Sequence, residues 1–136
     1  MTDFQAAASI QGRQFAEQCD TLLSTYGFQI HARVVLPQVG VEIDREAIAP
    51  SGRRIWFEYK GSLQGPRPGL MRTDTLKKAI ANGALLRALP ERHPYVVLTS
   101  HLPEVLSGAA MLKSAVDLGY FDDVICVYDP ADAVRL

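Results

Sequence analysis

The sequence predicts an α/β domain in which a mixed central sheet is flanked by helices. Two observations lead to this class. Strand-like and helix-like segments alternate through the second half of the chain, and the early strands look half exposed whereas the late ones are apolar throughout. The 136 residues are 48% hydrophobic and 21% charged, which is typical of an ordinary globular protein, so we expect residues 1–136 to form a single domain. The expected order is helix, three strands, helix, strand, helix, strand (αβββαβαβ).

The first half of the chain is expected to form one helix and three strands. Apolar residues recur at helical spacing over residues 9–25, and Gly27 provides a stop. Segments typical of strands follow at residues 28–36, 41–48 and 54–60. Because residues 50–52 (Pro-Ser-Gly) form a turn, the second and third strands are expected to pair as an antiparallel hairpin.

The second half begins with a loop at residues 61–69, which contain three glycines and two prolines. A helix through residues 76–86 is expected to begin at a cap, Thr73 or Asp74, and to end before Pro90. The remaining expected elements are a buried strand at 95–99, a helix at 104–118, a buried strand at 124–128 and either a turn of helix or a frayed tail at 131–136.

The cysteines and histidines show none of the spacings that structural zinc or redox motifs require. Cys19 and Cys126 are expected to be buried thiols, and His31, His93 and His101 are interpreted as structural or surface residues. No nucleophile elbow, phosphate-binding Walker motif or dinucleotide fingerprint is present. The sequence shows neither a leader pattern nor an apolar run long enough for a membrane span, so we expect a cytoplasmic protein that has no membrane partner.

Basic residues are concentrated in the middle of the chain. The net charge of −1 argues at first against a nucleic-acid partner, because phosphate binding depends on accumulated Lys and Arg. Residues 45–92, however, hold ten of the fourteen basic residues and four of the fifteen acids, a net charge of +6 that leaves −7 for the remainder. This asymmetry is what an electrostatic footprint on one face would produce.

The third predicted strand carries an acid and a lysine on one face. Residues two apart on a strand point the same way, so Glu58 and Lys60 project together while Phe57 and Tyr59 project from the other face. If the hairpin closes around residues 49–52, Asp44 falls almost opposite Glu58, and directly opposed residues have Cβ atoms about 5 Å apart. Two carboxylates and one ammonium would then meet in one patch.

A divalent cation would relieve the repulsion between two such carboxylates. Magnesium favours one or two carboxylates together with water and phosphate oxygens, a set that Asp44, Glu58 and the carbonyl of Tyr59 can begin to supply. In phosphodiester hydrolysis such an ion activates the attacking water and neutralises developing charge. Lys60 would orient or help to deprotonate that water, or would stabilise the developing charge. Mn²⁺ is the expected substitute for Mg²⁺.

The segment Val41-Glu-Ile-Asp44, a turn, and Trp56-Phe-Glu-Tyr-Lys-Gly61 together resemble the active-site hairpin of the PD-(D/E)xK nuclease superfamily. This family includes restriction endonucleases and Holliday-junction resolvases. The resemblance implies a restriction-endonuclease-like fold, DNA as substrate, and a catalytic set of Asp44, Glu58 and Lys60. It adds a glutamate on the first helix, which maps onto Glu17. Ile43 stands where the proline of the family motif would be.

Other interpretations of these residues stay open. Asp44, Glu58 and Lys60 can equally form a cross-strand salt-bridge cluster on a solvated face. Glu42 could replace Asp44 as a ligand or be an ordinary edge charge, and Glu17 could be a solvated helix residue. At the level of function, the alternatives are a non-cleaving nucleic-acid-binding or scaffold domain of the same fold and a protein-interaction domain.

Four basic residues flank the expected site and are candidates for DNA contacts: Arg67, Arg72, Lys77 and Lys78. We expect Lys77 and Lys78 to lie in the first turn of their helix, where the dipole disfavours cations and an approaching phosphate would offset that cost. The chain has little room for a separate sequence-reading domain. Specificity is therefore expected from a homodimer, from DNA structure or from a partner protein.

Overall fold

The computed structural model of the chain describes residues 3–61, 68–104 and 106–136, with side chains from residue 13 onward. Its elements are α1 (Asp3–Thr25), β1 (Gln29–Ile30), β2 (Val34–Leu36), β3 (Val41–Ile43), β4 (Arg45–Ile48), β5 (Arg54–Lys60), the 3₁₀ helix η1 (Gly69–Met71), α2 (Thr73–Leu86), β6 (Tyr95–Thr99), α3 (Leu106–Asp117), β7 (Asp123–Cys126) and α4 (Pro130–Ala133). No helix in these described ranges is long and apolar enough to cross a bilayer.

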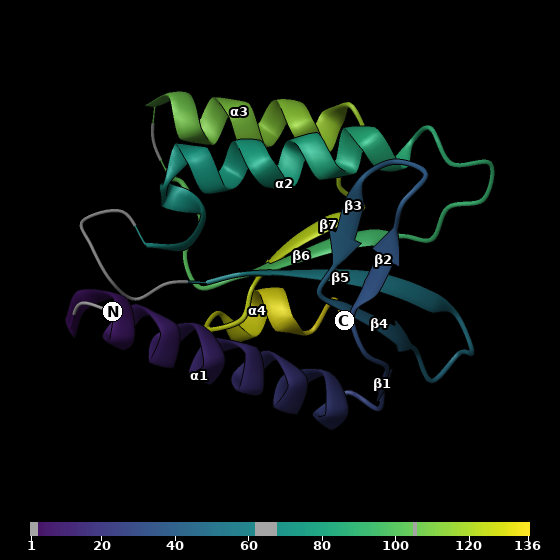
Figure 1. Cartoon of the computed structure of the whole chain (residues 1–136), viewed down its shortest axis with the longest axis horizontal. Coiled ribbons are helices and arrows are strands. Elements are labelled where there is room, and N and C mark those ends of the chain that lie inside the picture. Colours follow the sequence, from purple (N-terminus) through teal and green to yellow (C-terminus); the bar gives the residue numbers. More distant parts are fainter. Residues whose placement is uncertain (1–2, 62–67, 105) are drawn as a thin grey trace.

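The central sheet has the strand order β1-β4-β5-β6-β7. Strand β4 pairs antiparallel with β1 and with β5, whereas β5, β6 and β7 run parallel. Helices α2 and α3 cover one face of this sheet, and α1 and α4 lie on the other (Figure 1). The prediction of an α/β protein with a mixed sheet flanked by helices is therefore confirmed.

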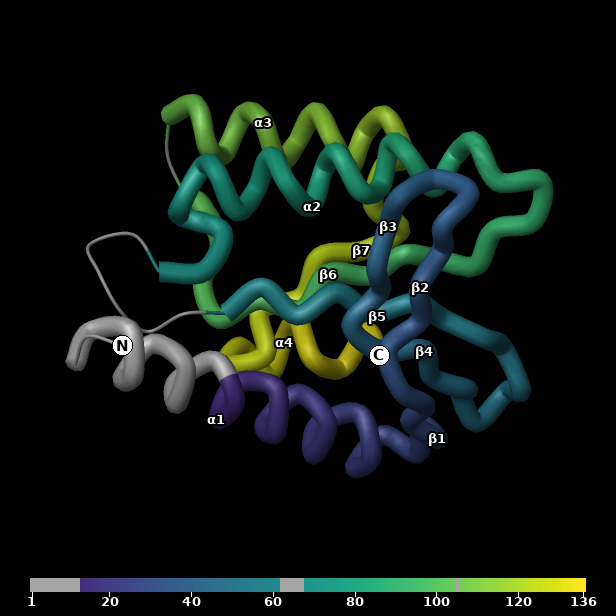
Figure 2. Tube along the Cα trace, viewed as in Figure 1, coloured from purple at the N-terminus to yellow at the C-terminus, as the bar shows by residue number. Residues whose placement is uncertain are grey.

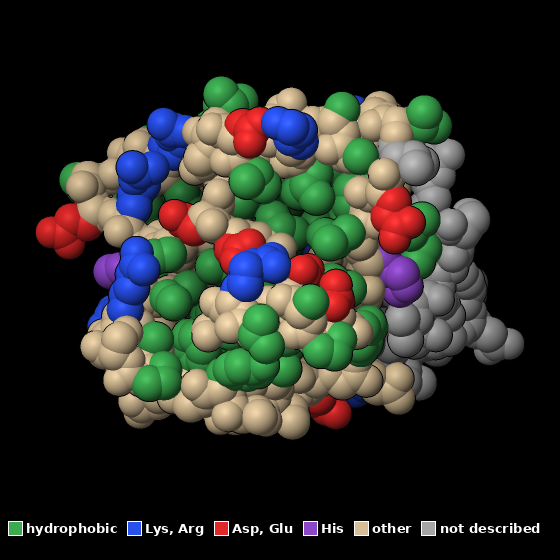
Figure 3. Space-filling view, turned by 180° about the vertical axis from the view of Figure 1, so that it is seen from behind, with side chains coloured by type: hydrophobic (Ala, Val, Ile, Leu, Met, Phe, Trp, Pro, Cys, Tyr) green, Lys and Arg blue, Asp and Glu red, His purple; other side chains and the backbone are tan. Residues whose placement is uncertain are grey.

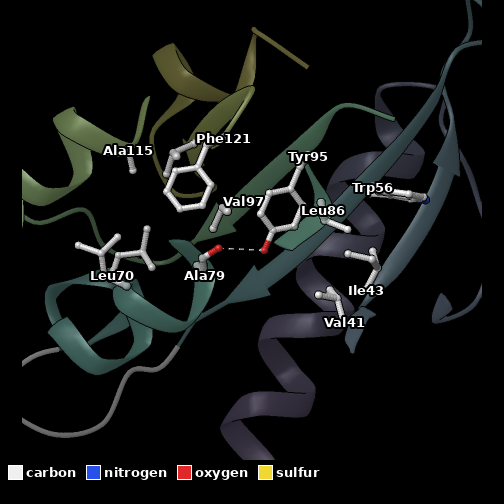
Figure 4. Packing of buried hydrophobic residues seen from close by; sticks show 12 residues of the cluster. Val41, Ile43, Trp56, Leu70, Ala79, Leu86, Tyr95, Val97, Ala115 and Phe121 are labelled. Carbon is white, nitrogen blue, oxygen red and sulfur yellow. Dashed lines mark hydrogen bonds between the residues drawn. The ribbon is translucent and has the colours of Figure 1, made fainter. Parts of the chain in front are cut away.

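Each face of the sheet has its own hydrophobic core, and β5 contributes to both. Phe57 packs with Phe15, Cys19 and Leu23 of α1, while Trp56 packs on the α2 side. Figure 4 shows that second cluster, in which residues of α2, β6 and β3 converge around Tyr95. The alternation expected for residues 54–60 is therefore confirmed for the positions that build the two cores.

The first two predicted strands are each interrupted. Strand β2 pairs with β3 in a separate two-stranded sheet, with Val34 opposite Ile43, while β1 and β4 remain in the central sheet. The hairpin thus bends away from the central sheet at Asp44 and rises toward α2 (Figure 2). The bend buries Val41 and Ile43 in the core on the α2 side, which compensates for the lost strand pairing.

Several helix boundaries and details differ from the expectations. The N-cap of α2 is Arg72 and makes no side-chain capping bond, so the predicted cap at Thr73 or Asp74 is wrong. Lys77 and Lys78 consequently lie in the second turn, beyond the strongest part of the helix dipole. Helix α1 begins at Asp3 rather than at residue 9, and residues 130–133 form α4.

Cys19 is fully buried as expected, and burial raises the pKa of its thiol. Cys126 is only half-buried, contrary to prediction, and both thiols are free. Gly83 is required inside α2 because a Cβ there would lie 2.3 Å from the carbonyl oxygen of Tyr120.

Candidate active site

Strand β5 places Glu58 beneath α2. The side chain is 2% exposed, and its Oε2 accepts hydrogen bonds from the Nδ2 amide of Asn82 at 2.9 Å and from the hydroxyl of Tyr95 at 2.8 Å. Both donors are neutral. A carboxylate taken out of water is costly unless it is fully compensated, and two neutral donors on one oxygen compensate it only in part.

Asp44 lies at the bend between β3 and β4, where the ladder with β5 begins. Arg45 is paired with Phe57, and one step further along this register brings Asp44 opposite Glu58, as the predicted turn at 49–52 requires. Beyond that point β3 has left the sheet, and the Oδ2 of Asp44 accepts the backbone N–H of Tyr59 at 2.8 Å. The carboxylate of Asp44 thus replaces the strand carbonyl that would otherwise pair with this N–H.

The carboxyl groups of Asp44 and Glu58 belong to opposed strand positions, and the charge of Asp44 acts on Glu58. Burial, followed by the neighbouring charge of Asp44, raises the pKa of Glu58 to about 7, against the lowering effect of Asn82 and Tyr95. Glu58 therefore keeps its proton to a higher pH than an ordinary carboxyl group does. A cation can take the place of that proton. Two ionised carboxylates this close repel each other, so binding of a cation between them is favoured.

The backbone carbonyl of Tyr59 and the end of β5 complete the surroundings of the pair. The C=O of a strand residue points to the same side as its N–H, so the Tyr59 carbonyl faces the edge where Asp44 lies. Lys60 is half-buried at the last position of β5 and shares the face of Glu58 by strand alternation. The hydroxyl of Thr99 donates to the Lys60 carbonyl at 2.8 Å and ties this strand end to β6.

The structure does not bring Glu17 to this pair. It is exposed on α1, in a groove shared with Gln18 and Tyr128, whereas Glu58 faces α2 on the other side of the sheet. Glu42 is also exposed and forms an ion pair with Arg33 at 3.4 Å instead of replacing Asp44. Of the four residues predicted to contact DNA, three are exposed, namely Arg72, Lys77 and Lys78, and Arg67 falls outside the described residues.

The basic residues of the middle segment do not share one face, contrary to the expected footprint. Arg45 is paired with Asp20 of α1, and Arg54 with Glu46. Another three arginines line a pocket near the start of β5 and β6: Arg53, Arg87 and Arg92. Segregation of charge along the sequence was not preserved in space.

Sequence reasoning missed three polar residues around these strands. Asp20 accepts the hydroxyl of Tyr59 at 2.6 Å and lies three residues before buried Leu23, a spacing that places it on the inner side of α1. Asn82 lies three residues after buried Ala79, and Tyr95 carries a hydroxyl into a buried strand. Each was recognisable as a polar group that needs a buried partner.

Within the described ranges, no three His, Cys, Asp or Glu side chains are close enough together to form a metal site. The candidate site is therefore a two-carboxylate site supplemented by backbone and water, rather than a cage of protein ligands. Comparison with protein-family models, with curated proteins and with solved structures gave no match.

Proposed function

We propose that this protein is a magnesium-dependent nuclease of restriction-endonuclease-like fold that hydrolyses phosphodiester bonds in DNA. The observation that carries the proposal is the pairing of Asp44 with buried Glu58 across two strands, with Glu58 two strand positions before Lys60. A buried carboxyl group whose pKa is raised, beside a second carboxyl group, is more typical of a functional site than of a structural ion pair, which would contain a cationic side chain.

The donor set fits a small hard cation. Asp44 and Glu58 each have an oxygen besides the one engaged with a protein donor, and the Tyr59 carbonyl faces the same edge. Mg²⁺ needs only one or two carboxylates, because water and substrate oxygens fill the remaining positions. When bound, the ion supplies an activated water and neutralises charge on the phosphate.

The chain's own residues then have distinct tasks. Asn82 and Tyr95 hold one oxygen of Glu58 and so direct the other toward Asp44. Lys60 orients the attacking water or, as a neutral amine, helps to deprotonate it; alternatively, its ammonium stabilises the charge that develops on the phosphate. Thr99 fixes the backbone at Lys60 and thereby the position of the lysine stem.

The topology supports the same assignment. An antiparallel hairpin followed by parallel strands, with the acid at the bend and the Glu-x-Lys triplet on the central strand, is the arrangement that the resemblance implies. DNA contacts would come from Arg72, Lys77 and Lys78, which are exposed on and before α2. Specificity would come from a second copy or a partner protein.

The test is incubation of the purified protein with supercoiled, linear and branched DNA, with Mg²⁺, with Mn²⁺ and with EDTA. We expect cation-dependent cleavage that disappears in Asp44→Asn and Lys60→Ala. Asp20→Asn is the matched control, since it removes a carboxylate from the other face of the sheet. Cleavage that is unchanged in Asp44→Asn would refute the site.

A non-cleaving DNA-binding or scaffold domain is the second candidate. It is favoured by the burial of Glu58 and by the structural use of Asp44, which accepts the Tyr59 N–H in place of a strand. This candidate predicts salt-sensitive DNA binding that needs no divalent cation. Binding without cleavage under every cation tested would select it.

A further inference from the structure

A pocket lies at the edge of the sheet where β5 and β6 begin, and Tyr95 of β6 is part of its lining. It has a volume of about 480 Å³ and is lined by residues from the β4–β5 turn, the end of α2, the segment that follows it, and the connection between α3 and β7. Figure 3 shows Lys and Arg side chains gathered with a histidine at the left edge of the molecule, which is the right edge of Figure 1.

Three of the lining residues are arginines with different surroundings. Arg87 is held in place, because its Nη1 donates to the Leu118 carbonyl at 2.8 Å and its guanidinium lies over the Tyr120 ring at 5.3 Å. Among the described residues, the guanidinium groups of Arg53 and Arg92 have no hydrogen-bond or ion-pair partner.

The positive charge of this pocket is not balanced by the protein. Asp122 is the single acid that lines the pocket in the described structure, and its Oδ2 is already bonded to the N–H of Tyr95 at 2.7 Å. By contrast, Arg54, the next residue after Arg53, is paired with Glu46 at 3.1 Å. Like charges that lack counter-charges repel one another. An anion in the pocket would attract all of these arginines and so turn an unfavourable electrostatic energy into a favourable one.

We propose that this pocket binds a phosphate-bearing small molecule. Guanidinium groups offer planar pairs of N–H donors that match phosphate oxygens, and the fixed Arg87 supplies one such fork in advance. The volume lies within the range of small-molecule sites, which is about 300–1,000 Å³. Apolar walls from Leu86, Leu118 and the ring of Tyr120 can contact the organic part of the ligand.

The proposal is independent of the nuclease assignment. The two sites share Tyr95, which lines the pocket and donates its hydroxyl to Glu58. Arg53 directly precedes β5 and Glu58 is the fifth residue of that strand, so about 17 Å of strand separates the two. Phosphate in this pocket would therefore be a ligand rather than the phosphodiester being cut.

The protein carries its own optical probe for the test. Trp56 is the sole tryptophan of the sequence, and its ring contacts that of His93 edge to face, with centroids 4.9 Å apart. Because His93 lines the pocket, a ligand there is expected to change Trp56 fluorescence. Titrations with inorganic pyrophosphate and with ADP, repeated by calorimetry, would measure binding without any cleavage assay.

The matched comparison uses two double variants that lose the same charge. Arg53→Ala/Arg92→Ala removes the two unpaired arginines, and Arg13→Ala/Arg33→Ala removes two exposed arginines that lie outside the pocket. We expect saturable binding of pyrophosphate or ADP that weakens at least about tenfold in the first variant, since each lost charge-assisted bond is worth that much. Binding should be retained in the second.

Three results would overturn the proposal. The first is the absence of saturable binding by both fluorescence and calorimetry. The second is an equal loss of affinity in the two double variants, which would mean general charge attraction. The third is binding of a 5′-phosphorylated oligonucleotide through Arg53 and Arg92 without binding of either small ligand, which would make the pocket part of a DNA interface.

Discussion

The two faces of the central sheet each hold a carboxylate close to β5, and they treat it differently. On the α1 face, Asp20 receives the guanidinium of Arg45 at 3.1 and 3.3 Å and the hydroxyl of Tyr59 at 2.6 Å. On the α2 face, Glu58 receives two neutral donors and lies against a second carboxyl group, that of Asp44. The first acid is neutralised by the protein, and the second is not.

Under the proposed function, this difference separates a structural acid, Asp20, from a functional one, Glu58. An ion pair such as Asp20–Arg45 is complete without any ligand. Burial lowers the pKa of Arg45, but the hydrogen bond and the charge of Asp20 raise it, and the net pKa lies above the ordinary value. The pair of Asp44 and Glu58 is complete only with a proton or a cation between its members. Natural proteins retain an electrostatic cost of this kind, here the repulsion between two carboxylates, where function requires it.

The largest expected effect is on cleavage. Glu58→Gln keeps the shape of the side chain but removes the charge that a cation needs, so we expect cation-dependent DNA cleavage to fall at least about a hundredfold. Asp20→Asn should change it by less than about threefold, because Asp20 is on the other face. Rates would be measured on the DNA form that the wild-type protein cuts best. Equal losses in both variants would abolish the distinction between the two faces.

The next effect is on stability, and it has the opposite sign for the same variant. The folded-state pKa of Glu58, about 7, lies above its ordinary value of 4.5. The contribution of protonated Glu58 to the stability of the fold is therefore fully present below pH 4.5 and is lost as the pH rises through 7. Glu58→Gln escapes this loss and should be more stable than wild type by up to about 3 kcal/mol at pH 8.

The measurement is urea unfolding at pH 8 and pH 4 without divalent cations. The advantage of Glu58→Gln should disappear at the lower pH, where the wild-type side chain is protonated in both states. A Glu58→Gln protein that is less stable than wild type at pH 8 would show that the charged form is well compensated in the fold.

Asp20→Asn should destabilise the protein, in contrast to Glu58→Gln. The variant weakens the bonds from Arg45 and from Tyr59, and we expect a loss of about 1–2 kcal/mol, discounted because both ionic side chains are about one-third exposed. Thermal unfolding at low and high salt would measure it. A neutral or stabilising effect would place Asp20 in the same class as Glu58.

The smallest effect is expected from Tyr95→Phe. The phenyl ring retains its contact with Phe121, so the loss is confined to the hydroxyl bonds to Glu58 and, at 3.5 Å, to the Ala79 carbonyl, at a cost of about 1 kcal/mol. Since the bond to Glu58 favours the charged form, its loss raises the pKa of Glu58, and the cost should be larger at pH 8 than at pH 5. A pH-independent cost would mean that the hydroxyl serves packing alone.

The sequence was informative wherever a rule of period or turn acts locally. Strands at residues 54–60 and 95–99 were predicted with their observed bounds, and the turn at 49–52 was enough to bring Asp44 opposite Glu58. These features depend on neighbours in the chain, which alternation and turn chemistry report directly.

Features set by tertiary contacts were not predictable in the same way. The bend at Asp44 exists because Val41 and Ile43 pack into the core formed with α2. No local pattern within residues 41–48 predicts that packing. Glu17 was assigned by resemblance, although the inner side of α1 presents Asp20 instead. The spread of the arginines over several surfaces likewise depends on the fold rather than on their order in the chain.

The most direct test is a calorimetric measurement of Mn²⁺ binding to the pair of Asp44 and Glu58, at pH 8 and in the absence of DNA. We expect one saturable site per chain in the wild-type protein and in Asp20→Asn, and no such site in Glu58→Gln. Unchanged binding in Glu58→Gln, or no binding to the folded wild-type protein, would contradict this expectation.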